Sequence, residues 1–310
     1  MTQARNPCPV LMAVMLMPLL IWTPLGLAAD IILFQPGQSS WEWLLVPSSH
    51  DGGKRMREGK SCLYCHEGEE KVIGDLIVSG EKLEPNPIES MPGFVEMAVT
   101  PEYDDSNLYL TFAWDAPAEG TTWGDEEDDV HLTVALGSND LNVAPIAGCW
   151  AACHSDLPGM PDAAADSDLK KYLPGSRNKM TASGGGTDIR SDAELEAQLA
   201  EGKYLEFWQA LLDGGELVAA RDGYFLESRN LNEDSAVSAT ANYDGGRWTV
   251  EMVRPLTASG SARHQLEEGV EYTVGIALHE NHASGRRHYT SFPMRLVLGA
   301  GEAQLTAARK

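Results

Sequence analysis

The chain has 310 residues, of which 43% are hydrophobic, so it can form a substantial core and is not disordered as a whole. Its formal net charge of -23 and pI of about 4.6 argue against nucleic acid as a partner, because phosphate would be repelled. The acidity fits an exported protein that attracts basic patches on other proteins. It fits equally a charged surface that serves only solubility.

Residues 1–29 predict an export signal. Residues 10–27 are almost wholly apolar, Arg5 precedes them, and Ala28-Ala29 supplies small residues for cleavage near Ala29. Pro18 and Pro24 weaken this run as a spanning helix, although its length reaches the lower limit for crossing a bilayer. We expect a soluble periplasmic protein after cleavage, and membrane attachment only if the segment is retained.

Residues 30–92 predict a small N-terminal helical module. A Trp-rich apolar stretch (residues 41–46) comes first, a helix is expected from about 51 to 72, and Pro85, Pro87 and Pro92 mark an extended linker. The helix contains Cys62-Leu-Tyr-Cys65-His66, the C-x-x-C-H pattern of c-type haem attachment. Two thiols at this spacing can add to the two vinyl groups of one porphyrin, and His66 then becomes an axial iron ligand.

The other axial ligand of this first haem is predicted to be His50. It lies twelve residues before Cys62, and two following glycines would let the chain fold back over the porphyrin. The alternative for His50 is an exposed turn residue. Met91 is the next candidate, since Met/His ligation is common in cytochromes, and Met56 is the third.

From Phe94 onward the pattern changes to strands. Residues 94–99 and 108–114 alternate around turn residues 103–107, which predicts a hairpin, and residues 130–136 predict another strand. The acidic run 125–129 lacks the spacing of a calcium loop, so we interpret it as solvated charge.

A second, looser motif follows at Cys149-Trp-Ala-Ala-Cys153-His154. It predicts a second haem c with His154 as axial ligand. A disulfide is the alternative for paired cysteines in an oxidising compartment, but such a small loop would stabilise little and would leave both histidines unexplained. A zinc site would need a further Cys or His pair at ligand spacing. Residues 158–187 form an irregular excursion that we expect to cover this haem.

The rest of the chain predicts one helix and four strands. Ser191 and Glu194 form a capping box, and apolar residues continue the helical pattern to Leu212, with Gly202 as a point of division. Residues 237–243 and 247–254 flank Asp-Gly-Gly, a strong hairpin signal. Residues 272–278 and 289–298 are the last strands.

Three histidines lie within ten residues between these last strands: His279, His282 and His288. We expect at least one to bind the second haem iron, while His131 and His264 are the remaining histidine candidates. Arg286 and Arg287 are placed to pair with haem propionates, since carboxylates favour guanidinium donors. Ordinary surface charge is the alternative for both arginines.

These elements predict a mainly β fold, an antiparallel β-sandwich at residues 93–300 with a short tail at 301–310. Residues 108–114, 148–156 and 279–293 together resemble the ethylbenzene-dehydrogenase-type haem-binding domain. That domain occurs in γ subunits of DMSO-reductase-family molybdenum enzymes and in related cytochrome c-552-like proteins. The resemblance covers roughly residues 94–298, and the N-terminal module looks like a fused small cytochrome c segment.

The resemblance implies a β-sandwich that holds one haem at the end of the sheets, between two loops. In the γ subunits a methionine and a lysine hold the iron, whereas the corresponding loops here carry His154 and His288, which implies bis-histidine ligation. Because of this departure, a molybdenum partner is not to be assumed.

Two functions remain open. The first is a periplasmic dihaem electron carrier between a quinol-linked donor and a terminal redox enzyme, alone or as a subunit of a molybdoenzyme-type complex. The alternative is a dihaem enzyme, a peroxidase or a sulfur- or nitrogen-oxide-transforming cytochrome, which requires one labile axial site.

Overall fold

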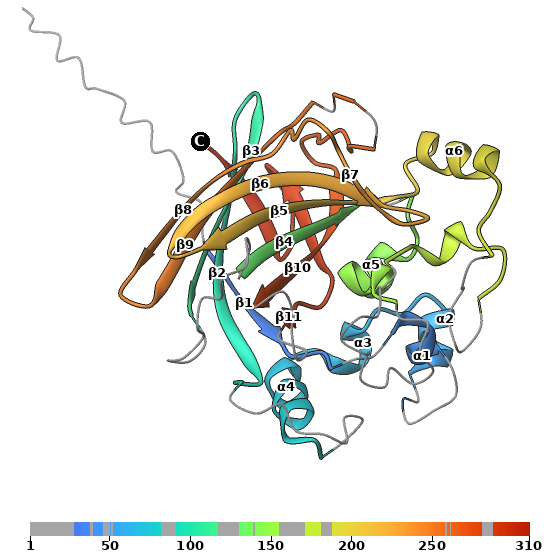
Figure 1. The fold of residues 1–310 in the computed structure, drawn as a ribbon, viewed down its shortest axis with the longest axis horizontal. Coiled ribbons are helices and arrows are strands. Elements are labelled where there is room, and N and C mark those ends of the chain that lie inside the picture. Colours follow the sequence, from blue (N-terminus) through green and yellow to red (C-terminus); the bar gives the residue numbers. More distant parts are fainter. Residues whose placement is uncertain are drawn as a thin grey trace, which may run out of the picture.

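The computed structural model describes residues 28–37, 40–45, 50, 52–81, 91–116, 130–138, 140–154, 171–180, 188–257, 259–260, 262–280 and 288–310. Over these ranges the protein is mainly β and mainly antiparallel, with a few short helices, as predicted (Figure 1). The strands are β1 (Ala29–Phe34), β2 (Phe94–Tyr103), β3 (Asn107–Asp115), β4 (Val130–Gly137), β5 (Leu205–Asp213), β6 (Glu216–Phe225), β7 (Arg229–Leu231), β8 (Ser238–Asp244), β9 (Arg247–Pro255), β10 (Glu271–Glu280), β11 (His288–Thr290), β12 (Met294–Leu298) and β13 (Leu305–Arg309). The helices are α1 (Trp41–Leu45), α2 (Gly53–Arg57), α3 (Leu63–His66), α4 (Glu70–Ser79), α5 (Ala144–Ala147) and α6 (Asp192–Ala200), with short 3-10 turns η1 (Gly148–Ala152) and η2 (Pro174–Ser176).

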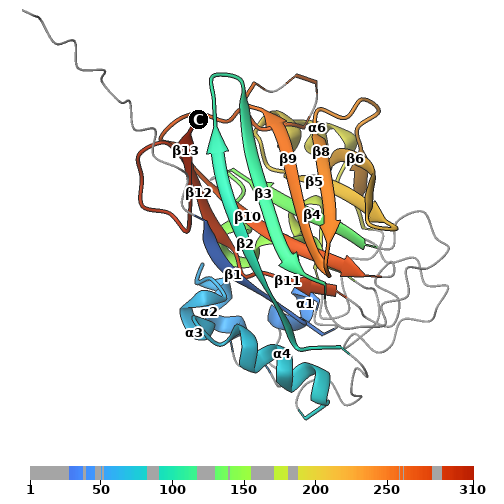
Figure 2. The ribbon, with the colours of Figure 1, turned by 90° about the vertical axis from the view of Figure 1, so that its left-hand side faces the viewer.

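In the described part of the chain, all strands join one continuous sheet in the order β7-β6-β5-β4-β10-β11-β1-β2-β3-β9-β8. One edge of β10 pairs with β11 at residues 277–279 and with β12 at residues 271–274. One edge of β2 likewise pairs with β1 at residues 94–99 and with β13 at residues 102–103. β13 runs parallel to both of its neighbours. Because the sheet curls over, β6 contacts β8, as Figure 2 shows. The sandwich predicted from the sequence is thus one sheet folded upon itself.

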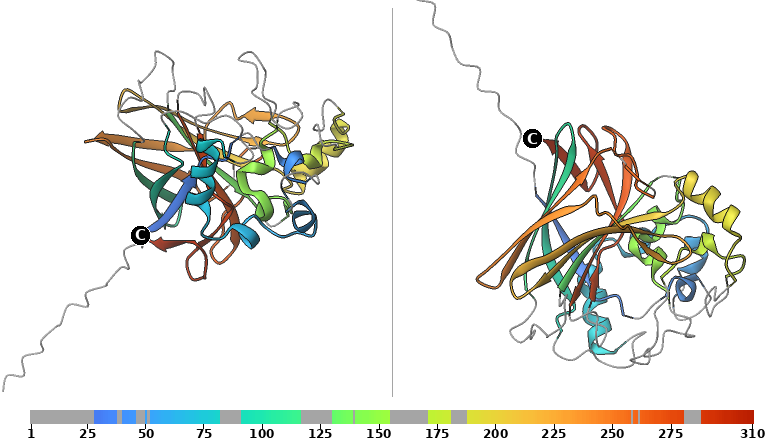
Figure 3. Two further views of the ribbon diagram at one scale, coloured as in Figure 1. Left: turned by 90° about the horizontal axis from the view of Figure 1, so that it is seen from below. Right: turned by 45° about the horizontal axis from the view of Figure 1, so that its top comes forward.

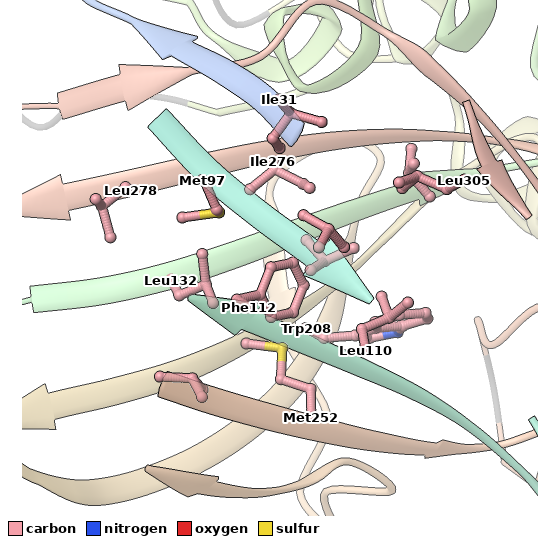
Figure 4. Close-up of a cluster of buried hydrophobic side chains, with 14 of the residues drawn as sticks. Ile31, Met97, Leu110, Phe112, Leu132, Trp208, Met252, Ile276, Leu278 and Leu305 are labelled. Carbon is pink, nitrogen blue, oxygen red and sulfur yellow. The ribbon is translucent and has the colours of Figure 1, made fainter. Parts of the chain in front are cut away.

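The concave side of this sheet encloses the main core (Figure 4). Side chains of β2 and β3 alternate between buried and partly exposed, which is the pattern of strands with one face on a core. Trp114, Trp208 and Trp248 are fully buried there, and Trp114 lies opposite Trp248 across the β3–β9 pair. Burying a large apolar side chain stabilises a fold by about 1.5–3 kcal/mol, so this core dominates stability.

Both predicted hairpins are present. β2 and β3 pair in register from Met97 opposite Trp114 to Tyr103 opposite Leu108. β8 and β9 are joined by Gly245 and Gly246, whose φ angles of 58° and 88° suit a two-residue turn.

The prediction of a helix reaching Leu212 was wrong. The capping box at Ser191 and Glu194 does start α6, but the helix ends before Gly202, which has a φ of 70°. Residues 205–213 form β5, a strand between β4 and β6 that is buried over almost its whole length. A strand buried on both faces carries a continuous apolar run, which periodicity does not distinguish from a buried helix.

The N-terminal segment contributes both helices and a strand. The helix expected at 51–72 is divided into α2, α3 and α4, with Gly59 and Gly68 at positive φ between them. β1 pairs with β2 on one side and with β11 on the other. Seen from below in Figure 3, these helices gather along one side of the sheet.

None of the helices in the described ranges is long and apolar enough to cross a membrane. Residues 1–27 of the predicted export signal (1–29), the linker prolines at 85 and 87, the acidic run at 125–129 and the loop at 281–287 lie outside the described residues.

Candidate haem sites

The first motif is carried by the short helix α3. Cys62 precedes the helix, and its carbonyl accepts hydrogen bonds from the backbone N–H groups of Cys65 and His66 at 3.2 and 3.1 Å. This turn places both thiols and the imidazole within one helical repeat. Cys62 is buried, which raises the pKa of its thiol to about 12, and Cys65 is exposed. The backbone N–H of Cys62 donates to the Ile146 carbonyl, at the end of α5 beside the second motif.

A cavity of about 120 Å³ lies beside this motif. Its walls are mainly apolar, as a porphyrin requires, and they include both cysteines of the motif. The lining residues are Pro36, Leu44, His50, Gly52, Arg55, Met56, Ser61, Cys62, Cys65, His66, Ile73, Ile77, Trp150 and Phe292.

His50 and His66 both line this cavity, with ring centroids 6.2 Å apart and ring planes inclined by 27°. The Nδ1 atom of His50 lies 3.2 Å from the Leu44 carbonyl, and Nδ1 of His66 lies 2.9 Å from a carboxylate oxygen of Glu69. Because both partners are acceptors, each Nδ1 carries the proton, and in a neutral ring Nε2 keeps the lone pair that binds metal. The structure thus brings the predicted pair together with suitable tautomers.

The two methionine candidates are placed differently. Met56 lines the cavity with the histidines. Met91 is buried in the main core cluster and is not among the lining residues. Of the two methionines, Met56 is thus the one that lines the cavity in this structure.

The second motif forms the turn η1, which packs directly on β10. Gly275 permits this approach, because a Cβ atom there would lie 2.7 Å from the backbone nitrogen of Cys149. The Cys149 sulfur lies 2.8 Å from the hydroxyl of Thr290 on β11. Burial raises the pKa of the Cys149 thiol to about 12 and also raises that of Cys153, while the positive charge of Lys171 acts in the opposite direction on both.

His154 is buried and has carboxylate and aromatic partners. Its Nδ1 atom is hydrogen-bonded to Oε1 of Glu42, and its Nε2 atom lies 3.1 Å from the carbonyl of Ala151. The ring of Tyr172 stacks on it, with centroids 4.0 Å apart and planes inclined by 12°. The backbone N–H of Trp41 also donates to the carbonyl of Cys153, so the start of α1 lies against this motif.

A row of three histidines crosses the neighbouring strands. His131 on β4 is opposite His279 on β10, and His279 is opposite His288 on β11. Their ring centroids are 4.6 Å and 5.7 Å apart, respectively. Side chains alternate along a strand, so His279 faces the same side of β10 as Gly275, against which η1 packs. Burial lowers the pKa of His279 well below 6.5, and the charge of Lys171 adds to that effect.

The row and the second motif therefore share one region, since Cys149 lies against Gly275 on β10 and Thr290 on β11, the strands that carry His279 and His288. His282, Arg286 and Arg287 belong to the undescribed loop between His279 and His288. His264 lies elsewhere, stacked on Tyr204 with centroids 4.3 Å apart.

The two motifs also contact each other. Trp150, between the two cysteines of the second motif, lines the cavity of the first motif together with Phe292. The Phe292 ring is nearly parallel to His66, with centroids 6.2 Å apart and an angle of 10°. Any haems at the two motifs would therefore be close neighbours.

The donor sets fit covalently bound haem. All four motif cysteines are free thiols, each pair is followed by a histidine, and each histidine has a carboxylate on Nδ1. Across the ranges with assigned structure, no group of three or more His, Cys, Asp or Glu side chains is arranged to hold a metal ion. Sequence reasoning missed Glu42 and Tyr172, which lie far from the motif along the chain.

The C-x-x-C-H motif, with both thiols and the histidine lining one apolar cavity, defines a c-type cytochrome. The chain is 33% identical over 288 residues to cytochrome c-552 of Stutzerimonas stutzeri, covering 91% of this chain and 89% of that protein. It is 28% identical over 287 residues to cytochrome c-551 of Rhodocyclus tenuis, covering 91% and 97%. The ethylbenzene dehydrogenase family model matches residues 223–291. The chain belongs to the cytochrome c-552 family and is a haem c protein with a cytochrome-type role in electron transfer.

Among solved structures, a family 9 carbohydrate-binding module from Caldicellulosiruptor kristjanssonii in complex with glucose matches with a TM-score of 0.30 and 9% identity, covering 64% of this chain and 67% of the module. A putative carbohydrate-binding protein from Bacteroides uniformis gives a TM-score of 0.31 and 9% identity, covering 66% and 72%. Similarity at this level carries no argument about function.

Proposed function

We propose that this protein is an exported dihaem electron carrier. It would relay single electrons between a quinol-linked donor and a terminal redox enzyme in the periplasm, alone or as a subunit of a molybdoenzyme-type complex. The observation that carries the proposal is the contact between the two motifs, because Trp150 of one lines the cavity of the other. Two redox centres held in contact within one chain can pass electrons without a further carrier.

The first haem is assigned to Cys62 and Cys65 as thioether partners, with His66 and His50 as axial ligands. The paired Nδ1 hydrogen bonds support this choice, since they leave Nε2 of each ring for iron. Two strong protein ligands favour electron transfer, because no position is left for substrate.

The second haem is assigned to Cys149 and Cys153, with His154 as one axial ligand and His288 as the other. His288 lies in the row that borders this motif, and His279 and His282 are the alternatives. The haem supplies a reversible one-electron couple when bound. The protein's part is to exclude water, to orient the ligands and to tune the potential.

The surface charge supports a basic partner. A net charge of -23 would accelerate encounter with positively charged faces at low ionic strength. The N-terminal apolar segment supports export, in the compartment where haem c proteins and quinol-linked enzymes meet.

The haem count is the direct test. Protein matured in a periplasmic expression host is measured by intact mass and by haem-to-protein ratio, and two covalent haems per chain are expected. Cys149→Ser should lose covalent attachment at the second site only, and Cys62→Ser at the first only. A colourless protein, or one haem per chain, would overturn the proposal.

A further inference from the structure

Glu42 is the one carboxylate of helix α1, and it reaches into the second motif. Its side chain is 2% exposed and that of His154 is 0% exposed. Oε1 of Glu42 accepts a hydrogen bond from Nδ1 of His154 and a second one from the hydroxyl of Tyr172 at 3.1 Å. Oε2 is buried and makes no hydrogen bond to the described residues. Burying a carboxylate with one oxygen unpaired costs free energy of folding, which points to a role for Glu42 other than stability.

The contact falls on Nδ1 of His154. Nε2, the nitrogen that would bind a haem iron, lies 3.1 Å from the carbonyl of Ala151 in this structure and would exchange that contact for the metal. A carboxylate that accepts the Nδ1 proton fixes the ring orientation and strengthens Nε2 as a donor. A stronger donor favours ferric over ferrous iron and thus lowers the reduction potential of the haem. Because both groups are buried, the interaction is little screened by water.

The first motif provides an internal comparison. His66 has the same kind of partner, Glu69, at 2.9 Å, but the two side chains are 34% and 54% exposed. Solvent screens that contact, as it does most surface ion pairs. The two haem sites therefore carry the same interaction in opposite environments.

We infer that Glu42 is a positioning residue of the second haem. It holds His154 through Nδ1 and keeps the reduction potential of that haem lower than it would otherwise be. The inference rests on the proposed function, since it requires a haem at Cys149, Cys153 and His154. It assigns a role to a residue about a hundred positions from the motif, on an element with no haem-attachment sequence.

Tyr172 distinguishes control of the reduction potential by Glu42 from a merely structural role of that carboxylate. Its hydroxyl donates to the same oxygen that accepts from His154. Removing the hydroxyl leaves more electron density on Oε1 for His154. Tyr172→Phe should therefore shift the potential in the direction opposite to Glu42→Gln.

The experiment is a spectroelectrochemical titration of the mature dihaem protein, with ferric EPR of each haem as a second readout. Glu42→Gln should raise one midpoint potential and change one EPR signal, leaving the other haem as in wild type. Tyr172→Phe should lower the same midpoint, and Glu42→Asp should restore most of the wild-type value. Glu69→Gln is the matched control and should produce a smaller upward shift, on the other haem.

Different results would contradict the proposed function and the role of Glu42. A wild-type protein with fewer than two haems overturns the proposed function. Two haems with unmoved potentials in Glu42→Gln, or with both moved equally, overturn the role of Glu42 alone. If Glu42→Gln does not accumulate, Tyr172→Phe decides, because an unchanged or raised potential there contradicts the inference.

Discussion

Trp150 packs edge-on against Phe292, with ring centroids 6.1 Å apart, and both rings line the cavity of the first motif although Trp150 belongs to the second. The indole thus lies between the two sets of haem-binding residues.

Trp150→Leu should slow electron exchange between the haems while leaving both midpoint potentials close to wild type. Flash photolysis or pulse radiolysis of half-reduced protein measures this rate. Trp150→Phe keeps an aromatic ring and serves as the control. Equal rates in all three proteins would show that the indole is not on the path.

His50 should be the ligand opposite His66. His50→Ala removes a strong-field donor, so one haem should become high-spin in optical and EPR spectra and should bind carbon monoxide when reduced. Met56→Leu is the control, because Met56 lines the same cavity and its removal should leave the spectrum unchanged. A low-spin His50→Ala spectrum would move the assignment to a methionine.

Among the histidines of the row, His288 should be the ligand of the second haem. His288→Ala should turn that haem high-spin and leave the first unchanged, whereas His131→Ala should alter neither spin state. If His279→Ala produces the high-spin signal instead, the ligand is His279. A wild-type protein that already contains a high-spin, nitrite-binding haem would favour the enzymatic alternative over the carrier.

Gly275 should be required for seating the second motif. In Gly275→Ala the new Cβ would meet the backbone of Cys149, so η1 must shift. We expect a loss of roughly 1–3 kcal/mol in the free energy of unfolding, as for other overpacked sites, and poorer haem attachment at Cys149. Gly175→Ala is the control, since its nearest neighbour is a flexible side-chain oxygen at 3.5 Å. Chemical denaturation of both variants measures the difference, and equal losses would contradict this account.

His264 should make stability fall in mild acid. Burial lowers its pKa from 6.5 to about 4, so between these values the unfolded chain holds a proton that the folded chain does not. The free energy of unfolding therefore falls as pH drops through this window, by about 3 kcal/mol in all. His264→Gln should show a shallower decline between pH 6.5 and 4 in urea titrations. The same slope in both proteins would show that other groups are responsible.

Local chemistry made some of the site predictable. The thiols and histidines of each motif are sequence neighbours, and the structure keeps each set together because one turn of chain holds them. The approach of His50 to His66 also followed from short-range reasoning about Gly52 and the chain reversal. The hairpins followed from turn residues for the same reason.

Long-range partners were not predictable in this way. Glu42 meets His154 only because α1 packs against η1, and no local pattern marks that contact. The alignment of His131 with His279 depends on strand register, which a single sequence does not specify. The mistaken helix at 205–212 has a related cause, since burial on both faces of β5 removed the alternation that marks a strand.

The position of β1 has a mechanical consequence. This strand, which precedes the first motif in the chain, pairs with β2 along its length and with β11 at Phe34. β1 therefore fixes the start of the leading segment to the sheet. The first motif is itself tied to the end of α5 through the hydrogen bond from Cys62 to Ile146. If both proposed haems are bound, these two attachments would keep the porphyrins near each other, and electron passage would not wait for domains to meet.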